Sequence, residues 1–325
     1  MSIYPEMRMR RLRRTENLRG IFSENVVRRE SLIMPMFFDE TIGDKEEIST
    51  MPGIYHYSLD SGIEKAKEYE RTGISSVLLF GIPKIKDSTG SQSYATDGIV
   101  QRAILELKKK TSLNVFADLC MCEYTDHGHC GILSGDYVDN DKTLVEYRKI
   151  AHSYADAGVD VVAPSGMMDG QVKAIREELD QSGFKNTIIM GYSAKFASSM
   201  YAPFREAAHS APSFGDRRSY QMNFANSREA MREIEEDISE GADIIMVKPA
   251  MFYLDLVREA RNTFSLPLAV YNVSGEYSMI MNAAKYELID GRSVVKELLT
   301  SFKRSGADLI ISYFSEYAIK EGIAR

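Results

Sequence analysis

The sequence has 325 residues, 44% of them hydrophobic and 27% charged, with a formal net charge of −7 and an isoelectric point near 5.5. This composition is ordinary for a soluble globular protein, and the acidic balance argues against nucleic acid as the main partner. No apolar run is long enough to cross a membrane and the start lacks the apolar segment of a signal peptide, so we expect a cytoplasmic protein with no membrane partner.

Residues 1–20 differ from the rest of the chain. They have little apolar periodicity and carry six arginines: Arg8, Arg10, Arg11, Arg13, Arg14 and Arg19. On sequence alone, a solvated basic tail is the simplest interpretation. We therefore predict an N-terminal arm over residues 1–20, followed by a single domain over residues 21–325.

Short apolar segments then recur along the chain. They are rich in Val, Ile and Leu rather than alternating with polar residues, which is typical of parallel strands buried on both faces. The eight predicted strands are Leu32–Phe38, Ser76–Ile82, Leu113–Met121, Val159–Ser165, Thr187–Tyr192, Ala242–Pro249, Leu266–Ser274 and Ala307–Phe314.

Helical spacing of apolar residues marks the segments between these strands. The predicted helices are Asp60–Arg71, Thr143–Ala157, Asp169–Gln181, Ser227–Ser239, Tyr253–Thr263 and Arg292–Arg304. Glycines that suit a left-handed helix stop precede several strands, namely Gly73, Gly158, Gly241 and Gly306. This alternation predicts an α/β protein with a (β/α)8 barrel, a TIM barrel, and an open doubly wound sheet is the alternative.

One long stretch, from Ser198 to Asn226, has no steady period and follows the fifth predicted strand. Long loops inside compact domains are often lids or binding loops. In a barrel of this class the active site lies at the carboxyl ends of the strands, where this loop begins.

Two lysines stand at the ends of successive predicted strands. Lys195 follows the run IIMGYSA, and Lys248 closes the run IIMVKP. Neighbouring strands lie about 4.8 Å apart, so both amines can share one pocket. Apolar surroundings and a second nearby cation each lower the pKa of an amine, and a neutral amine can form a Schiff base with a ketone.

The chain's three cysteines, Cys120, Cys122 and Cys130, fall in the single window DLCMCEYTDHGHC. An odd number in a reducing compartment indicates a metal rather than disulfides. Three thiolates would leave one tetrahedral position open, as in catalytic zinc sites, whereas a fourth ligand from His127 or His129 would make a closed structural site. Incidental thiols are the third possibility.

Further polar groups stand at or near other strand ends: Ser165, Ser274 and Tyr313. Each could also be an ordinary loop contact. Arg205 and Arg217 in the long loop could clamp a carboxylate, although arginines are common in surface loops.

Several of these motifs together resemble one family. They are DLCMCEYTDHGHCG, APSGMMDG, GYSAKFAS, SAPSFGDRRSYQ, EGADIIMVKPA, YNVSGEYSM and GADLIISYF. The chain is similar, from about Ile21 almost to its end, to the porphobilinogen synthases, also called 5-aminolevulinate dehydratases, and among them to the zinc-dependent type. These hydro-lyases condense two 5-aminolevulinate molecules to porphobilinogen in tetrapyrrole and heme biosynthesis.

The resemblance implies specific roles. Lys248 would hold the first substrate and Lys195 the second, both as Schiff bases. Arg205 and Arg217 would bind the carboxylate of the second substrate. Ser274 and Tyr313 would bind the carboxylate of the first substrate, and the three cysteines would bind a catalytic zinc ion. Glu233 matches the ligand of an activating, allosteric magnesium ion, although a glutamate on an acidic helix is usually just solvated. The family also implies a homo-oligomer, typically an octamer, in which the arm embraces a neighbouring barrel.

Asp118, next to the cysteines, is our candidate for proton transfer or for holding the substrate amine. Two other classes of function stay open on sequence grounds. A class I aldolase would need one essential lysine and no zinc, and a zinc-stabilised binding protein would keep its metal without catalysis.

Overall fold

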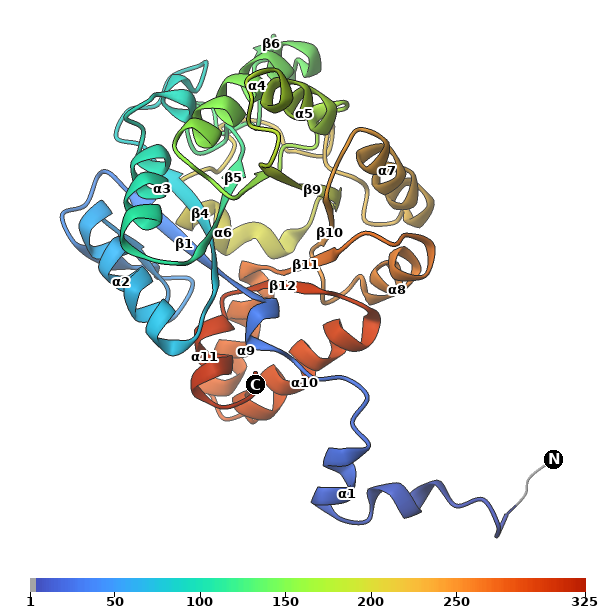
Figure 1. The fold of residues 1–325 in the computed structure, drawn as a ribbon. Coiled ribbons are helices and arrows are strands. Elements are labelled where there is room, and N and C mark those ends of the chain that lie inside the picture. The colour runs from blue at the N-terminus through green and yellow to red at the C-terminus, as the bar shows by residue number, and fades with distance from the viewer. Residues whose placement is uncertain (1–3) are drawn as a thin grey trace.

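Eight parallel strands form a closed barrel in the computed structural model, which describes residues 4–325 (Figure 1). In chain order they are β1 (Leu32–Asp39), β4 (Ser76–Ile82), β5 (Asn114–Leu119), β8 (Val161–Pro164), β9 (Ile188–Lys195), β10 (Ile244–Lys248), β11 (Leu268–Asn272) and β12 (Leu309–Ser312). Each pairs with the next, and β12 pairs with β1 to close the ring. The predicted (β/α)8 barrel is confirmed, and the open sheet is excluded.

Helices surround the barrel on its outside (Figure 1). They are α2 (Leu59–Thr72), α3 (Ile99–Lys110), α4 (Asn140–Asp156), α5 (Gln171–Gln181), α7 (Ser227–Ser239), α8 (Leu254–Thr263), α9 (Ser274–Lys285), α10 (Gly291–Ser305) and α11 (Ser315–Lys320). The six predicted helices are all present. The sequence reading missed α3, α9 and α11. α3 follows a polar loop without a capping side chain, α9 begins one residue after a strand, and α11 is only six residues long.

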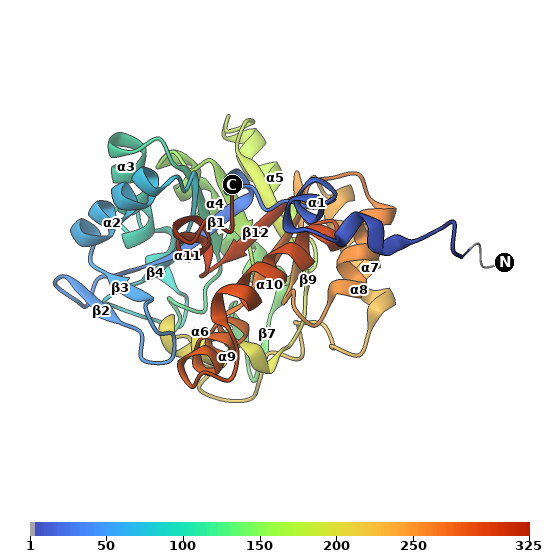
Figure 2. The same cartoon turned by 90° about the horizontal axis from the view of Figure 1, so that it is seen from below.

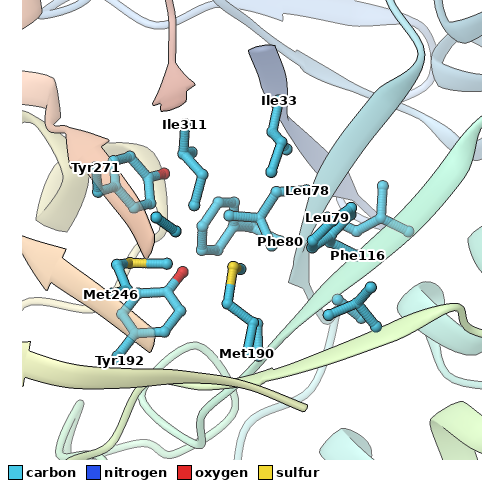
Figure 3. Close-up of a cluster of buried hydrophobic side chains, with 14 of the residues drawn as sticks. Ile33, Leu78, Leu79, Phe80, Phe116, Met190, Tyr192, Met246, Tyr271 and Ile311 are labelled. Carbon is cyan, nitrogen blue, oxygen red and sulfur yellow. The ribbon is translucent and has the colours of Figure 1, made fainter. Parts of the chain in front are cut away.

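Large apolar side chains fill the barrel interior. Figure 3 shows this packing, with side chains from opposite strands meeting on the barrel axis. The labelled residues are Ile33, Leu78, Leu79, Phe80, Phe116, Met190, Tyr192, Met246, Tyr271 and Ile311. The interior is therefore a packed core rather than a pore, and polar chemistry is confined to its mouth.

Strand ends differ from the prediction at three functional positions. β9 continues to Lys195, so this lysine lies in the strand rather than after it. Ser274 is the first residue of α9 rather than the end of a strand, and Tyr313 follows β12 instead of lying within it. Burial explains the first difference, since every residue from Ile189 to Lys195 is buried although the later ones are not all apolar.

The stretch after β9 contains two short helical segments, η4 (Ser199–Tyr201) and α6 (Ala202–Ala207), and is otherwise irregular up to α7. Figure 2 shows α6 beside α9 at one end of the barrel. We call residues 198–226 the lid segment. Two small hairpins, β2 (Lys45–Glu47) with β3 (Tyr55–Tyr57) and β6 (Leu133–Ser134) with β7 (Tyr137–Val138), complete the sheets.

Residues 4–21 project away from the barrel (Figure 1). They contain the 3-10 helix η1 (Met9–Arg13) and the short helix α1 (Glu16–Ile21), and a further 3-10 turn, η2 (Arg29–Ser31), leads into β1. Apolar side chains here are exposed, with Met9 at 68% and Ile21 at 73%. Within residues 4–325, no helix is both long and apolar enough to cross a membrane.

Candidate active site

Lys195 and Lys248 lie directly opposite one another at the carboxyl ends of β9 and β10. Each side chain is only 5% exposed. The Nζ atom of Lys195 donates a hydrogen bond to the carbonyl oxygen of Ser165, at the end of β8. Two amines are therefore buried side by side at the mouth of the barrel, as the two strand-end motifs predicted.

Aromatic rings surround the Lys248 amine. Its Nζ atom lies 4.0 Å from the ring centroid of Tyr271 and 4.9 Å from that of Tyr192, with Tyr201 and Phe204 of the lid segment within 5.5 Å. Burial, with the neighbouring Lys195 ammonium as the second cause, lowers the pKa of Lys248 to about 7. Near neutral pH, Lys248 is therefore substantially a neutral amine and a nucleophile.

Asp118, at the end of β5, is buried beside the lysines. Its Oδ2 atom accepts a hydrogen bond of 3.0 Å from the Ser165 hydroxyl, and its Oδ1 atom has no partner among the described residues. Burial raises the pKa of Asp118 to about 6, although both lysine charges oppose the rise. Ser165 thus contacts Asp118 through its side chain and Lys195 through its backbone.

The three cysteines gather on the loop that follows β5. Their sulfur atoms lie within 4.8 Å of one another, and no other group of His, Cys, Asp or Glu side chains in residues 4–325 is so arranged. The Sγ atoms of Cys120 and Cys122 are 3.3 Å apart, and all three residues are buried. This cluster could hold a metal ion, and thiolates suit a soft or borderline ion.

The ring nitrogens of both nearby histidines already contact other groups. The ring nitrogens of His129 contact the hydroxyl of Tyr220 and the carbonyl oxygen of Phe214, each at 3.1 Å. Those of His127 contact the backbone N–H of His129 and the carbonyl oxygen of Ser88. The set of candidate ligands is therefore three thiols, which favours the open arrangement over a closed four-ligand site.

Arg205 and Arg217 of the lid segment lie near one another, and neither forms an ion pair with a carboxylate among residues 4–325. Arg217 is 5% exposed and donates to the carbonyl oxygens of Gly128 and Ser210, and Arg205 is half-buried. Both Nε atoms are buried and unpaired. Burial and the adjacent Arg217 lower the pKa of Arg205, so this pair has unmet capacity for an anion.

Ser274, the first residue of α9, and Tyr313, which follows β12, are both buried. The Ser274 hydroxyl accepts a hydrogen bond from the backbone N–H of Phe204 and donates one to the carbonyl oxygen of Met200. The hydroxyls of Tyr313 and Tyr271 are 3.3 Å apart. Ser274 thus contacts the lid segment directly.

Glu233 is not part of this group. It lies on α7, outside the barrel, and lines a cavity of about 180 Å³ with four other carboxylates: Asp169, Glu236, Asp237 and Glu240. Burial and the nearby Asp169 charge raise the pKa of Glu233. The five side chains do not converge closely enough to form a ligand cluster.

Sequence reasoning missed several groups at the site. Glu123 is buried, with its Oε2 atom 3.2 Å from the Cys122 sulfur, and burial raises its pKa well above the usual value. Its position within the cysteine window was the available signal. The rings of Tyr192 and Tyr271 gave none, because aromatic residues on buried strands are usually core residues.

Comparison with known proteins assigns the family. A family model described as delta-aminolevulinic acid dehydratase matches residues 6–321. The chain belongs to the delta-aminolevulinic acid dehydratase family. It is 52% identical over 318 residues to the delta-aminolevulinic acid dehydratase of Methanothermus sociabilis, covering 98% of this chain and 99% of that protein. With the Helicobacter pylori dehydratase it shares 53% identity over 311 residues, covering 95% and 96%.

A solved dehydratase structure has the same fold. The Toxoplasma gondii delta-aminolevulinic acid dehydratase (porphobilinogen synthase), crystallised with its reaction product porphobilinogen, superposes with a TM-score of 0.94 at 40% identity. The match covers 97% of this chain and 91% of that chain. The resemblance found in the sequence motifs is confirmed at the level of the dehydratase family.

The lowered pKa of Lys248 gives a test of the dehydratase site. The rate of reductive methylation at Lys248, with formaldehyde and cyanoborohydride, should rise with pH through a midpoint of about 7, because only the neutral amine reacts. Peptide mapping by mass spectrometry measures it. Exposed Lys110, whose pKa is raised by its bond to Glu106, is the internal control and should still be gaining reactivity above pH 10. A midpoint for Lys248 near that of Lys110 would contradict the burial argument.

Proposed function

We propose that this chain condenses two molecules of 5-aminolevulinate to porphobilinogen, through Schiff bases on Lys248 and Lys195 and with a catalytic zinc ion. Family membership along the whole chain and the product named for its Toxoplasma relative support the overall reaction. The observation that carries the mechanism is the pairing of two buried lysines across β9 and β10. A class I aldolase would use one such lysine and leave the other without a role.

The steps use both amines. Neutral Lys248 attacks the ketone of the first substrate, and the ketone oxygen leaves as water when the imine forms. Lys195 forms the second imine in the same way, releasing the second water. One iminium loses an α-proton to give an enamine, which forms the C–C bond. The substrate amine forms the C–N bond, both lysines are released, and loss of a ring proton gives the pyrrole. Asp118 would accept a proton or hold the substrate amine, and its burial beside the lysines supports this role.

Substrate carboxylates require cations or hydroxyls. Arg205 and Arg217, whose Nε atoms are unpaired, would supply a site for the second substrate's carboxylate. Ser274 and Tyr313 supply hydroxyls for the first. Because Ser274 already contacts the lid segment, carboxylate binding there and lid position would be linked. A closed lid would exclude the water that hydrolyses imines.

Cys120, Cys122 and Cys130 would hold the zinc ion, since three buried thiols with no fourth protein ligand fit a catalytic zinc site. Bound there, zinc would supply Lewis acidity and a positive charge near the second substrate. Glu233 would hold a magnesium ion with an allosteric effect, outside the barrel on α7. The exposed neighbours Asp169 and Glu236 support a hydrated ion rather than a tight cage.

We infer that the protein is cytoplasmic. The charge and exposure of its N-terminal arm support assembly with further copies of the chain. Residues 4–20 are arginine-rich and largely exposed, whereas the chain as a whole is acidic. A second subunit would offer complementary charge, and apolar side chains such as Met9 would be covered there. We infer a division into an arm of residues 1–20 and a barrel of residues 21–325, assembled as a homo-oligomer, typically an octamer.

Trapping tests the Schiff bases. Borohydride added with 5-aminolevulinate should label Lys248, and also Lys195 at saturating substrate, because both amines face the same pocket. Peptide mapping locates the adducts, and reductant without substrate is the control. Adducts confined to surface lysines such as Lys84 would contradict the proposed imine mechanism.

Removal of zinc tests the metal role separately. Chelation, or alanine at Cys120, Cys122 or Cys130, should lower turnover by about 100-fold or more while the circular dichroism spectrum stays close to that of the parent chain. An open site contributes catalysis more than folding energy. Ser134→Ala in β6 is the matched control and should keep both metal and activity. Unfolding on zinc loss would instead indicate a structural site.

Deletion of residues 1–20 tests the arm. The truncated chain should keep the barrel fold but form a smaller assembly with lower activity, since the arm has too few apolar residues to fold without a partner. Light scattering and the circular dichroism spectrum, compared with the full chain, measure the two properties. An unchanged large oligomer would identify the arm as a solvated tail.

A further inference from the structure

Strand β9 contains a bulge three residues before its end. Gly191 pairs with Ile245 of β10, and the next pair is Ala194 with Val247. Two residues of β9, Tyr192 and Ser193, therefore lie opposite the single residue Met246. An extra residue of this kind changes which way the following side chains point, and bulges often occur beside active sites.

The bulge determines where Lys195 lies. If the same residues of β9 paired with β10 without a bulge, Lys248 would lie opposite Ala194 instead of Lys195. Side chains an odd number of residues apart on a regular strand point to opposite faces. Yet Tyr192 points into the barrel (Figure 3), and the Lys195 amine lies 5.6 Å from its ring. The bulge is what brings both side chains to the inner face.

Asp237 of α7 packs against the outer side of this bulge. A Cβ atom on Gly191 would lie 2.5 Å from the Oδ2 atom of Asp237 and 3.0 Å from the Ser193 hydroxyl. The absent Gly191 side chain thus provides the space for the carboxyl group. Asp237 is 9% exposed, and its Oδ2 atom has no hydrogen-bond partner among the described residues.

A buried carboxyl group with an unpaired oxygen is costly to folding. Burial raises the pKa of Asp237 to about 7, against the opposing effect of the Ser193 hydroxyl. An apolar side chain of similar size at this helix position would avoid that cost. Asp237 also lines the carboxylate cavity beside Glu233, and its close approach to Gly191 and Ser193 is what links it to the bulge of β9.

We propose that Asp237 is a positioning residue for the condensation, holding the β9 bulge from outside through Gly191 and Ser193 and so directing the Lys195 amine toward Lys248. It touches no substrate and acts only through the strand. The inference rests on the proposed Schiff-base function, because it assigns a cause to the position of one of the two reacting amines.

The role of Asp237 is specific to one lysine. Lys248 lies on β10, which runs without an extra residue, and its amine is fixed by the rings of Tyr271 and Tyr192. Loss of the Asp237 side chain should therefore impair imine formation at Lys195 and leave Lys248 largely unaffected. A residue needed only for general stability would affect both lysines alike.

The experiment measures borohydride-trapped 5-aminolevulinate at each lysine by quantitative peptide mapping. In Asp237→Ala the Lys195 adduct should fall about 10-fold or more relative to the Lys248 adduct, since displacements of about 1 Å cost this much or more. Asp237→Asn keeps the shape of the neutral carboxyl group and should restore the ratio. Glu235→Ala, which removes an exposed carboxylate of the same helix, is the matched control and should match the parent chain.

The possible failures are distinct. A parent chain that traps substrate at neither lysine would overturn the proposed function, and the inference with it. Equal Lys195-to-Lys248 ratios in the parent chain and Asp237→Ala would overturn the inference alone. Should Asp237→Ala fail to fold, Ser193→Ala decides the question, because it removes the hydroxyl that lies near Asp237 and donates to the carbonyl oxygen of Gly191 within the bulge. An unchanged ratio there contradicts the inference, and a selective fall at Lys195 supports it.

Discussion

Two amines are kept out of water next to one another, and much of the site follows from that constraint. Burying one ammonium group costs free energy, and burying a second one beside it costs more, so the pKa of at least one lysine is lowered toward neutral. The pKa of Lys248, which lies among aromatic rings, is lowered in this way, while Lys195 donates a hydrogen bond to the carbonyl oxygen of Ser165. The barrel makes this possible because its closed, rigid wall holds neighbouring strand ends in a fixed register.

A second group of side chains at the mouth has unpaired donors rather than buried amines. Arg205 and Arg217 lie on the lid segment near the cysteine loop, where Arg217 already ties the two loops together through Gly128 and Ser210. The thiols, the guanidinium groups and the amines come from separate segments of chain. The strand ends bring them to one place, which is why this type of barrel suits a reaction between two substrates.

Much of the fold could be predicted from the sequence, because parallel strands buried on both faces leave long apolar runs. The lysines and cysteines were predictable for the related reason that such residue types are unusual at the end of a buried strand. The limits of β9 were not, since its last residues are polar yet buried. Ser274 was assigned to a strand because α9 begins without any turn. Nothing in the sequence marked Asp237, whose partners Gly191 and Ser193 are brought near it only by packing.

The irregularity in β9 also bears on how such a chain can change over evolutionary time. Removing one residue at Tyr192 or Ser193 would restore even pairing with β10, and a regular ladder is what a barrel strand otherwise favours. Such a deletion would keep Lys195 opposite Lys248, but it would remove either the ring beside the Lys248 amine or the hydroxyl beside Asp237. The extra residue thus adds a side chain to the strand without changing how the two lysines pair, and an insertion of this kind can be accepted in a strand that carries catalytic groups.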